Sequence, residues 1–394
     1  MTFNEVFLQF TKDQILKQLE STTEDQVRNT LKQAAAGHSL SPEQFLALLS
    51  PQADRQLEQM AQISARNTRQ RFGNVVQLYV PLYLSNECLC DCTYCGYSKN
   101  NSIARLTLNK DQILEESLAL HRMGFRHILL LSGEDARYVN DTTLADVAEW
   151  IRPYFSSISI EVQPLKTEEY ARLVRAGIDG LTVYQETYDR EIYSLVHLAG
   201  KKKHFDYRLA APERGGEAGM RRINVGALLG LSDWRYDGFC AGLHASFLEK
   251  KFWQSHISVS LPRMRHAAGA HHKLFQVTDR NFVQLMTALR LFLPNAGITL
   301  STRESASLRD HIVSLGVTQM SAGSRTTPGG YSEENNTGKQ FEIEDKRTPD
   351  EVASMLRKQG FDPVWKDWDT GLTMPDVDHP SGIITPQSSS GNVC

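Results

Sequence analysis

The chain has 394 residues, of which 41% are hydrophobic and 23% are charged, and its formal net charge is −3. A charge this close to neutral gives no electrostatic footprint for nucleic acid or for an anionic membrane surface. No apolar run approaches the roughly 20 residues that span a bilayer, and the first ten residues do not have the pattern of a secretory signal. We therefore expect a cytoplasmic protein that binds neither nucleic acid nor membrane.

The first 72 residues are polar and have helical periodicity. Ser41-Pro-Glu-Gln44 is a capping-box start with proline at the first helical position. A second helix is predicted from about Ala53 to Arg71, ending at Gly73. We expect a helical extension over residues 1–72 that covers a larger domain and carries no chemical motif.

From Asn74 to Gly330 short apolar runs alternate with amphipathic stretches. The predicted strands are Val75–Leu84, His127–Leu131, Ser157–Val162, Leu181–Tyr184, Ile223–Leu228, Ile257–Leu261, Ile298–Ser301 and Val317–Ser321. Predicted helices between them include Lys110–Met123, Glu168–Ala176, Leu209–Met220, Trp234–Phe252 and Asp279–Leu293. This alternation predicts an α/β fold, a closed (β/α)8 barrel of the TIM type, over residues 73–330. An open doubly wound sheet is the alternative, because periodicity does not establish closure.

The barrel pattern stops after Gly330. Phe341–Glu344 is predicted as a short strand, and Thr348-Pro-Asp-Glu351 is another capping-box start. We expect a short α+β extension over residues 331–373. The proline- and serine-rich stretch over 374–394 is typical of a flexible tail.

Four of the six cysteines fall within eight residues, directly after the first predicted strand. In a cytoplasmic protein such crowding indicates metal binding rather than a disulfide framework. The C-x3-C-x2-C spacing of Cys88, Cys92 and Cys95 supplies three thiolates, which would leave one iron of a 4Fe-4S cluster without a protein ligand. A zinc knuckle with Cys90 as fourth ligand is the alternative, but alternating cysteines do not match the usual zinc spacings. We expect Cys90 not to be a ligand.

This three-cysteine loop resembles that of the radical S-adenosylmethionine superfamily. In that superfamily the amino and carboxylate groups of S-adenosylmethionine occupy the open iron. The resemblance implies a 4Fe-4S cluster held by Cys88, Cys92 and Cys95, with S-adenosylmethionine as the second cofactor. Tyr94, the aromatic residue before the last cysteine, takes the position that rests near the adenine in these enzymes.

Ser132-Gly133-Glu134 follows the second predicted strand. It looks like the Gly-Gly-Glu-type motif of the same superfamily, whose backbone receives the amino group of the cofactor. Glycine permits close approach of the backbone to a ligand. A lone Ser-Gly-Glu is a common turn, but its place at a strand end, one βα unit after the cysteines, favours a cofactor-binding role.

Three further positions are assigned to the cofactor by resemblance. Gln185 and Glu186, after the fourth strand, are expected to hold the ribose hydroxyls, although a polar strand cap is the alternative. Arg208, placed at the start of the helix before the fifth strand, is expected to pair with the cofactor carboxylate. An exposed helix arginine is the competing interpretation. Ala227, in the fifth strand, belongs to the small apolar backbone where adenine usually lies.

Arg303 follows the seventh predicted strand, with Ser301 close by. A guanidinium at the mouth of a barrel is suited to a two-pronged contact with a substrate carboxylate. A structural, salt-bridged arginine is the alternative, and Pro262–Arg265 is a weaker candidate of the same kind. Apart from Arg208, these positions lie at the C-terminal ends of predicted strands, where barrel enzymes place their chemistry.

Among radical S-adenosylmethionine enzymes, the sequence is most similar to the 2-iminoacetate synthase family, the tyrosine lyases of bacterial thiamine thiazole synthesis. The resemblance is carried jointly by Arg69–Gly73, Tyr79–Asn86, Val183–Tyr188, Gly226–Asp233, Leu300–Glu304, Pro328–Tyr331 and Pro363–Trp368. It implies reductive cleavage of S-adenosylmethionine to methionine and a 5′-deoxyadenosyl radical. This radical oxidises L-tyrosine, whose Cα–Cβ bond breaks to give 2-iminoacetate and p-cresol. The implied partners are L-tyrosine, a low-potential electron donor of the flavodoxin or ferredoxin type, and thiazole synthase.

Two other functions compete with this one. The hydrogenase-maturation tyrosine lyases, which make carbon monoxide and cyanide, resemble the chain through the barrel but carry a second cluster on C-terminal cysteines. Here Cys394 is the sole cysteine after Cys240, which favours the thiazole family. A hypothesis from another class is a non-catalytic metal-binding module that docks on a partner, and it predicts a colourless zinc protein.

Overall fold

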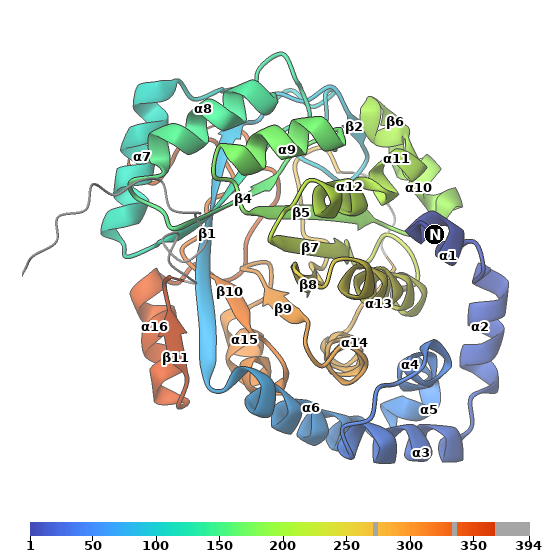
Figure 1. Cartoon of the computed structure of the whole chain (residues 1–394). Coiled ribbons are helices and arrows are strands. Elements are labelled where there is room, and N and C mark those ends of the chain that lie inside the picture. The colour runs from blue at the N-terminus through green and yellow to red at the C-terminus, as the bar shows by residue number, and fades with distance from the viewer. Residues whose placement is uncertain (271–274, 333–336, 367–394) are drawn as a thin grey trace, which may run out of the picture.

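The computed structural model describes residues 1–270, 275–332 and 337–366. Figure 1 shows a central barrel of strands surrounded by helices, with the N-terminal helices forming an arc along one side. The tail expected over 374–394 lies outside the described residues. In the ranges that are described, no helix is both long and apolar enough to cross a membrane.

The barrel is closed and its strands are all parallel. β10 pairs with β1 through Gln77 opposite Gln319 and Leu78 opposite Met320, so the first and last strands join. This pairing confirms the predicted barrel and rules out the open sheet. Each barrel strand coincides with a predicted run, with ends shifted by at most two residues: β1 (Val75–Ser85), β3 (His127–Ser132), β4 (Ser157–Glu161), β5 (Gly180–Glu186), β7 (Arg222–Ala227), β8 (His256–Ser260), β9 (Gly297–Leu300) and β10 (Gln319–Ser321).

Helices follow the barrel strands and form the outer layer (Figure 1). They are α7 (Lys110–Arg122), α8 (Asp141–Ile151), α9 (Thr167–Arg175), α10 (Arg190–Val196), α11 (Phe205–Leu209), α12 (Ala211–Glu217), α13 (Trp234–Lys251), α14 (Asp279–Phe292), α15 (Ala306–Ile312) and α16 (Pro349–Lys358). The helix predicted over Leu209–Met220 is wrong in its start, because Pro212 lacks an N–H and belongs to the first turn of a new helix, α12. Arg208 consequently lies in the last turn of α11 rather than at a helix start.

The N-terminal residues form a chain of helices that packs on α13 and α14. They are α1 (Phe3–Phe7), α2 (Lys12–Ser21), α3 (Glu24–Ala35), α4 (Pro42–Leu49), α5 (Pro51–Asp54) and α6 (Leu57–Phe72). The predicted capping box is present, since Ser41 and Gln44 exchange hydrogen bonds at the start of α4. Helix α6 ends at Gly73 as expected but begins after Ala53, because α5 forms a separate turn. Phe45 stacks on Phe292 at 4.4 Å and joins this extension to the barrel core.

The chain after the barrel returns to its rim and wall. The strand predicted over Phe341–Glu344 is wrong, because its backbone N–H groups bond to different loops and not to one neighbouring strand. Glu342 donates to the carbonyl of His266, and Glu344 donates to that of Thr302. Helix α16 starts at the predicted capping box of Thr348 and Glu351. A short strand that the sequence did not reveal, β11 (Asp362–Val364), pairs with the first residues of β1.

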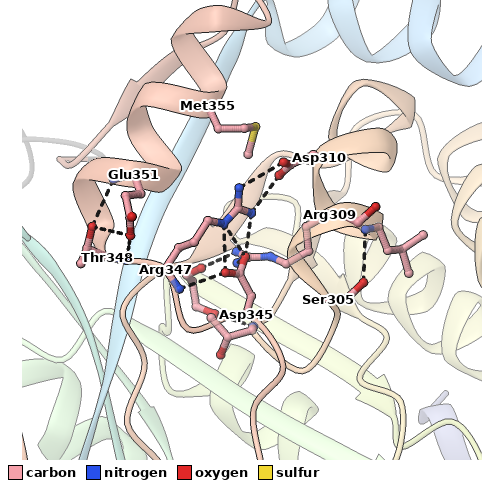
Figure 2. A network of polar contacts seen from close by, with 12 residues as sticks. Ser305, Arg309, Asp310, Asp345, Arg347, Thr348, Glu351 and Met355 are labelled. Carbon is pink, nitrogen blue, oxygen red and sulfur yellow. Dashed lines mark hydrogen bonds and ion pairs between the residues drawn. The ribbon is translucent and has the colours of Figure 1, made fainter.

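A buried ionic network fastens this C-terminal segment to α15 (Figure 2). The side chains of Arg309, on α15, and Asp345 form an ion pair in which both are fully buried. Arg347 contacts Asp345 and Asp310, each at 2.8 Å. The segment that follows the barrel is thereby an integral part of the packed structure.

Candidate active site

The three-cysteine loop leaves the C-terminal end of β1 and is supported by a small antiparallel ribbon. In this ribbon β2 (Asp91–Cys92) pairs with β6 (His197–Ala199). Cys92 is buried, Cys88 and Cys95 are half-buried, and burial raises the pKa of both the Cys92 and the Cys95 thiol. Across the described part of the chain, no three His, Cys, Asp or Glu side chains converge on a single metal ion.

Glycines permit the close packing around this loop. A Cβ on Gly133 would lie 2.1 Å from the carbonyl oxygen of Glu87, so the motif after β3 fits directly against the cysteine loop. Gly200, at φ +84°, follows β6, and a Cβ there would lie 2.6 Å from Sγ of Cys90. Both contacts involve backbone or a buried thiol, which cannot simply move aside.

Cys90 occupies a different environment from the other three cysteines. Its backbone N–H donates to Sγ of Cys88 at 3.4 Å, and its own thiol contacts the Glu134 carboxylate at 3.5 Å. The contact with Cys88 and burial together raise its thiol pKa. Cys90 thus packs against Cys88, Glu134 and Gly200. That it does not bind the cluster stays our prediction.

Two carboxylates and two cations form a buried ionic cluster beside the loop. Arg208 contacts Glu134 at 2.9 Å and Glu186 at 3.6 Å, and Lys202 contacts Glu186 at 2.6 Å. Burial lowers the pKa of Lys202 and of Arg208, but the neighbouring carboxylates outweigh it, so both pKa values lie above their ordinary ranges. The structure brings together Glu134, Glu186 and Arg208 as the sequence suggested, and adds Lys202, which the sequence analysis missed.

The end of β5 carries backbone strain and unpartnered polar atoms. Glu186 has φ 71°, the sole positive value of a non-glycine residue in the described ranges, and Ala227 pairs with it across the sheet. Such conformations are costly and cluster at functional sites. The side chain of Gln185 is buried with neither amide atom hydrogen-bonded, and the hydroxyl of Ser132 is buried without a partner too.

Tyr94 points back into the same cluster. Its hydroxyl shares a 2.8 Å hydrogen bond with Nε2 of His197, and Nζ of Lys202 lies 5.8 Å from its ring centroid. Burial, helped by Lys202, lowers the pKa of His197 to about 3, so this imidazole is neutral. The aromatic ring before the last cysteine is therefore fixed against the ribbon.

Arg303 lies at the mouth of the barrel after β9. Its guanidinium lies 3.4 Å from the centroid of Phe341, its Nη1 donates to the carbonyl of Arg263 at 3.5 Å, and its backbone N–H donates to Oγ of Ser301 at 3.5 Å. Among described residues it has no carboxylate partner. Arg263 and Arg265, in the weaker candidate at 262–265, both pair with Glu304, so their charges are already compensated within the protein.

Comparisons with known proteins agree with this geometry. The model of the Radical SAM superfamily matches residues 82–239, and that of the Biotin and Thiamin Synthesis associated domain matches residues 260–362. The 2-iminoacetate synthase of Salmonella typhimurium is 45% identical over 94% of this chain and 98% of its own, and that of Escherichia coli is 44% identical over the same shares. Among solved structures, the FeFe-hydrogenase maturase HydG matches with a TM-score of 0.85 and 32% identity, over 90% of this chain and 80% of that one.

The closed barrel with three cysteines at its mouth defines an enzyme of the radical S-adenosylmethionine class, which implies a 4Fe-4S cluster and S-adenosylmethionine. The sequence identity to the two 2-iminoacetate synthases extends over nearly the whole length of both chains, so it defines a particular family within this class. The chain belongs to the 2-iminoacetate synthase family.

The residues present fit these cofactors. Three thiols share one loop, as a cluster with one open iron requires. The unpartnered amide of Gln185 and hydroxyl of Ser132 are buried polar groups, which proteins rarely leave without a hydrogen bond. A polar ligand between β3 and β5 would satisfy them.

Proposed function

We propose that this chain is a 2-iminoacetate synthase, a carbon–carbon lyase that splits L-tyrosine into 2-iminoacetate and p-cresol. The observation that carries the proposal is identity of 45% over 98% of a curated 2-iminoacetate synthase. The three-cysteine loop, the ionic cluster and Arg303 at one end of a closed barrel support it.

The cysteine loop is the site proposed for the cluster. Cys88, Cys92 and Cys95 hold the 4Fe-4S cluster, and Cys90 does not. When bound, the cluster and S-adenosylmethionine supply the one-electron cleavage that starts the reaction. The thiols must be deprotonated to bind iron, and burial opposes this for Cys92 and Cys95, so cluster insertion is expected to release protons.

The residues around the loop are assigned to the polar groups of S-adenosylmethionine. The strand end at Ser132, Gly133 and Glu134 receives the amino group, and Arg208 pairs with the carboxylate. Gln185 and Glu186 hold the ribose, while Tyr94 and Ala227 border the adenine. Arg208 is already paired with Glu134 and Glu186, so its buried charge is compensated before the cofactor carboxylate binds.

The substrate is held from the other side of the mouth. Arg303 binds the carboxylate of L-tyrosine, with Ser301 next to it. Tyr79 and Tyr83 of the barrel wall are buried, and both interact electrostatically with Arg303. The proposed partners are a low-potential electron donor of the flavodoxin or ferredoxin type and thiazole synthase.

Product analysis tests the function directly. The anaerobically reconstituted enzyme, with S-adenosylmethionine, a low-potential reductant and L-tyrosine, should release p-cresol and 5′-deoxyadenosine, with glyoxylate from hydrolysis of 2-iminoacetate. Carbon monoxide or cyanide would favour the maturase reaction suggested by the likeness to HydG. Alanine variants of Cys88, Cys92 or Cys95 should lose the cluster spectrum, whereas Cys90→Ala should retain it.

A further inference from the structure

Glu161 ends β4 at the barrel mouth and was not singled out by its sequence context. Successive side chains of a strand point to opposite faces, so Glu161 shares the face of Ser159. Ser159 lines a cavity inside the barrel together with Tyr79 and Tyr184. Glu161 therefore faces the interior, one step nearer the mouth, where it lies opposite Leu131 of β3.

The Glu161 carboxylate has no hydrogen-bond or ion-pair partner among the described residues. Burial raises the pKa of Glu161 to about 7, the nearby Glu186 adds to this, and Arg303 opposes it. The four charges of the adjacent cluster, by contrast, neutralise one another.

Among the described residues Arg303 has no carboxylate partner, although its Nη1 donates to the carbonyl of Arg263, and it interacts electrostatically with Glu161 without forming an ion pair. Burial lowers the pKa of Arg303, and its neighbours, Glu186 and Glu161 among them, offset this only in part. A carboxylate and a guanidinium that are both removed from water and do not pair with each other destabilise the fold, unless a bound ligand pairs with each of them. The complementary ligand carries both signs, as the zwitterion of an α-amino acid does.

We propose that Glu161 receives the ammonium group of the amino acid substrate and accepts one proton from it, while Arg303 holds the carboxylate. This inference rests on the proposed function, since it assigns the two poles of L-tyrosine to these two residues. It adds a catalytic residue between the cofactor side and the substrate side of the mouth.

The proposed step is a proton transfer that needs no co-reactant. An N–H bond of the substrate ammonium breaks, its electron pair stays on nitrogen, and an O–H bond forms on the Glu161 carboxylate. The amine produced has the lone pair that the C=N bond of 2-iminoacetate requires. An ammonium has no such pair, so the proton must leave before that bond can form.

The pH dependence follows from the groups that face Glu161. These are Tyr79 and Tyr83 from β1, Tyr184 and Glu186 from β5, Lys202 and Arg208 from the ionic cluster, and Arg303. Burial raises the pKa of the three tyrosines, so they stay protonated at neutral pH. The acid limb of p-cresol formation should therefore reflect protonation of Glu161.

The test compares Glu161→Gln with Glu168→Gln, an exposed carboxylate on the following helix α9. Cluster content, S-adenosylmethionine binding, kcat, KM for L-tyrosine and the pH profile are measured on the reconstituted holoenzymes. We expect Glu161→Gln to keep the cluster and cofactor binding, to lose about 100-fold or more in kcat as is typical for a missing general base, and to lose the acid limb. Glu161→Asp should recover at least part of kcat, and Glu168→Gln should behave as wild type.

Distinct outcomes would overturn the inference. If Glu161→Gln kept kcat and the acid limb within about twofold of wild type, Glu161 would not accept a proton. A rise in KM alone would limit it to binding, which contradicts the proposed transfer. If the Gln and Asp variants both lacked the cluster, Glu161 would be structural. Absence of p-cresol from the wild type would instead contradict the proposed function, which separates the two failures.

Discussion

Buried arginines of this chain differ in what compensates their charge. Arg309 pairs with Asp345 and Arg208 with Glu134, whereas Arg303 rests on Phe341 and has no carboxylate partner in the described structure. Charge-assisted contacts contribute about 1.5–3 kcal/mol. We expect Arg303→Ala to weaken L-tyrosine binding by this amount, which is about 10- to 150-fold in the dissociation constant.

The conservative variant sharpens that prediction. Arg303→Lys should restore binding incompletely, because a single ammonium cannot reproduce a two-pronged contact. Arg325→Ala, at an exposed arginine after β10, is the matched control and should bind L-tyrosine normally. Unchanged KM and product yield in Arg303→Ala would make this arginine structural.

Sequence patterns predicted site residues at strand ends in recognisable motifs, but they did not single out two charged residues that the structure places beside them. Lys202 is the middle of three lysines in the 3-10 helix Lys201–Lys203, and such a run ordinarily indicates a solvated surface. The fold turns it inward, where it pairs with Glu186. Glu161 ends a strand, as many surface glutamates do. That it lacks a charged partner depends on which residues of other strands face it, and this cannot be read from the sequence.

At the level of elements, the β2–β6 ribbon supports the cysteine loop through close packing at Gly200. Gly200→Ala should displace Cys90 and lower cluster content, because its Cβ would lie 2.7 Å from the Cα of Cys90. Gly37 is a matched control: its φ of +80° is nearly that of Gly200, but nothing lies within 4 Å of its Cβ position.

Both variants carry the same backbone strain, so the comparison isolates the steric contact. Iron content and the absorption spectrum after anaerobic reconstitution provide the measurement, and circular dichroism checks the fold. Gly37→Ala should show a modest loss of stability with full cluster content. Equal cluster content in the two variants would mean that the ribbon does not position the loop.

The eight barrel strands were predictable because each is a short apolar run that is buried on the sheet. The failures have local physical causes. Pro212 lies in the first turn of a new helix, where the apolar periodicity predicted one continuous helix. Phe341–Glu344 has residues typical of a strand, but its backbone hydrogen bonds go to different loops. Closure of the barrel depends on the β1–β10 contact, which no local pattern encodes.

For the whole molecule, the network of Figure 2 joins the C-terminal segment to the barrel. Asp345→Asn leaves the buried Arg309 without its full countercharge, and breaking a buried pair costs about 3–5 kcal/mol of unfolding free energy. Asp350→Asn, on the exposed start of α16, should change stability by less than about 0.5 kcal/mol. Denaturant unfolding of the two variants beside wild type measures the difference, and equal midpoints would contradict the prediction.

The same pair gives a pH dependence with a defined sign. Burial alone raises the pKa of Asp345, but Arg347 and Arg309 hold it below the ordinary aspartate value of 3.8. A depressed carboxyl pKa stabilises the fold fully above the unfolded value, and this contribution is lost as pH falls through the folded value. Wild type should therefore lose stability below about pH 4, and Asp345→Asn should show less of this acid dependence.

The cysteine loop is held by residues that are synthesised long after it. The backbone N–H of Gly96 donates to the backbone carbonyl of Gln340 at 2.9 Å. The Tyr83 hydroxyl donates to the side-chain Oε1 of Gln340 at 2.7 Å, and the Tyr97 hydroxyl donates to the carbonyl of Thr326 at 2.7 Å. At a ribosomal rate of about 5–20 residues per second, the three thiols emerge some 12–50 s before Gln340 is made. During that interval the loop lacks these supports and its thiols are open to oxidation. We therefore expect stable cluster binding to require the chain at least as far as Gln340, and nascent chains that end before Gln340 should not retain a cluster.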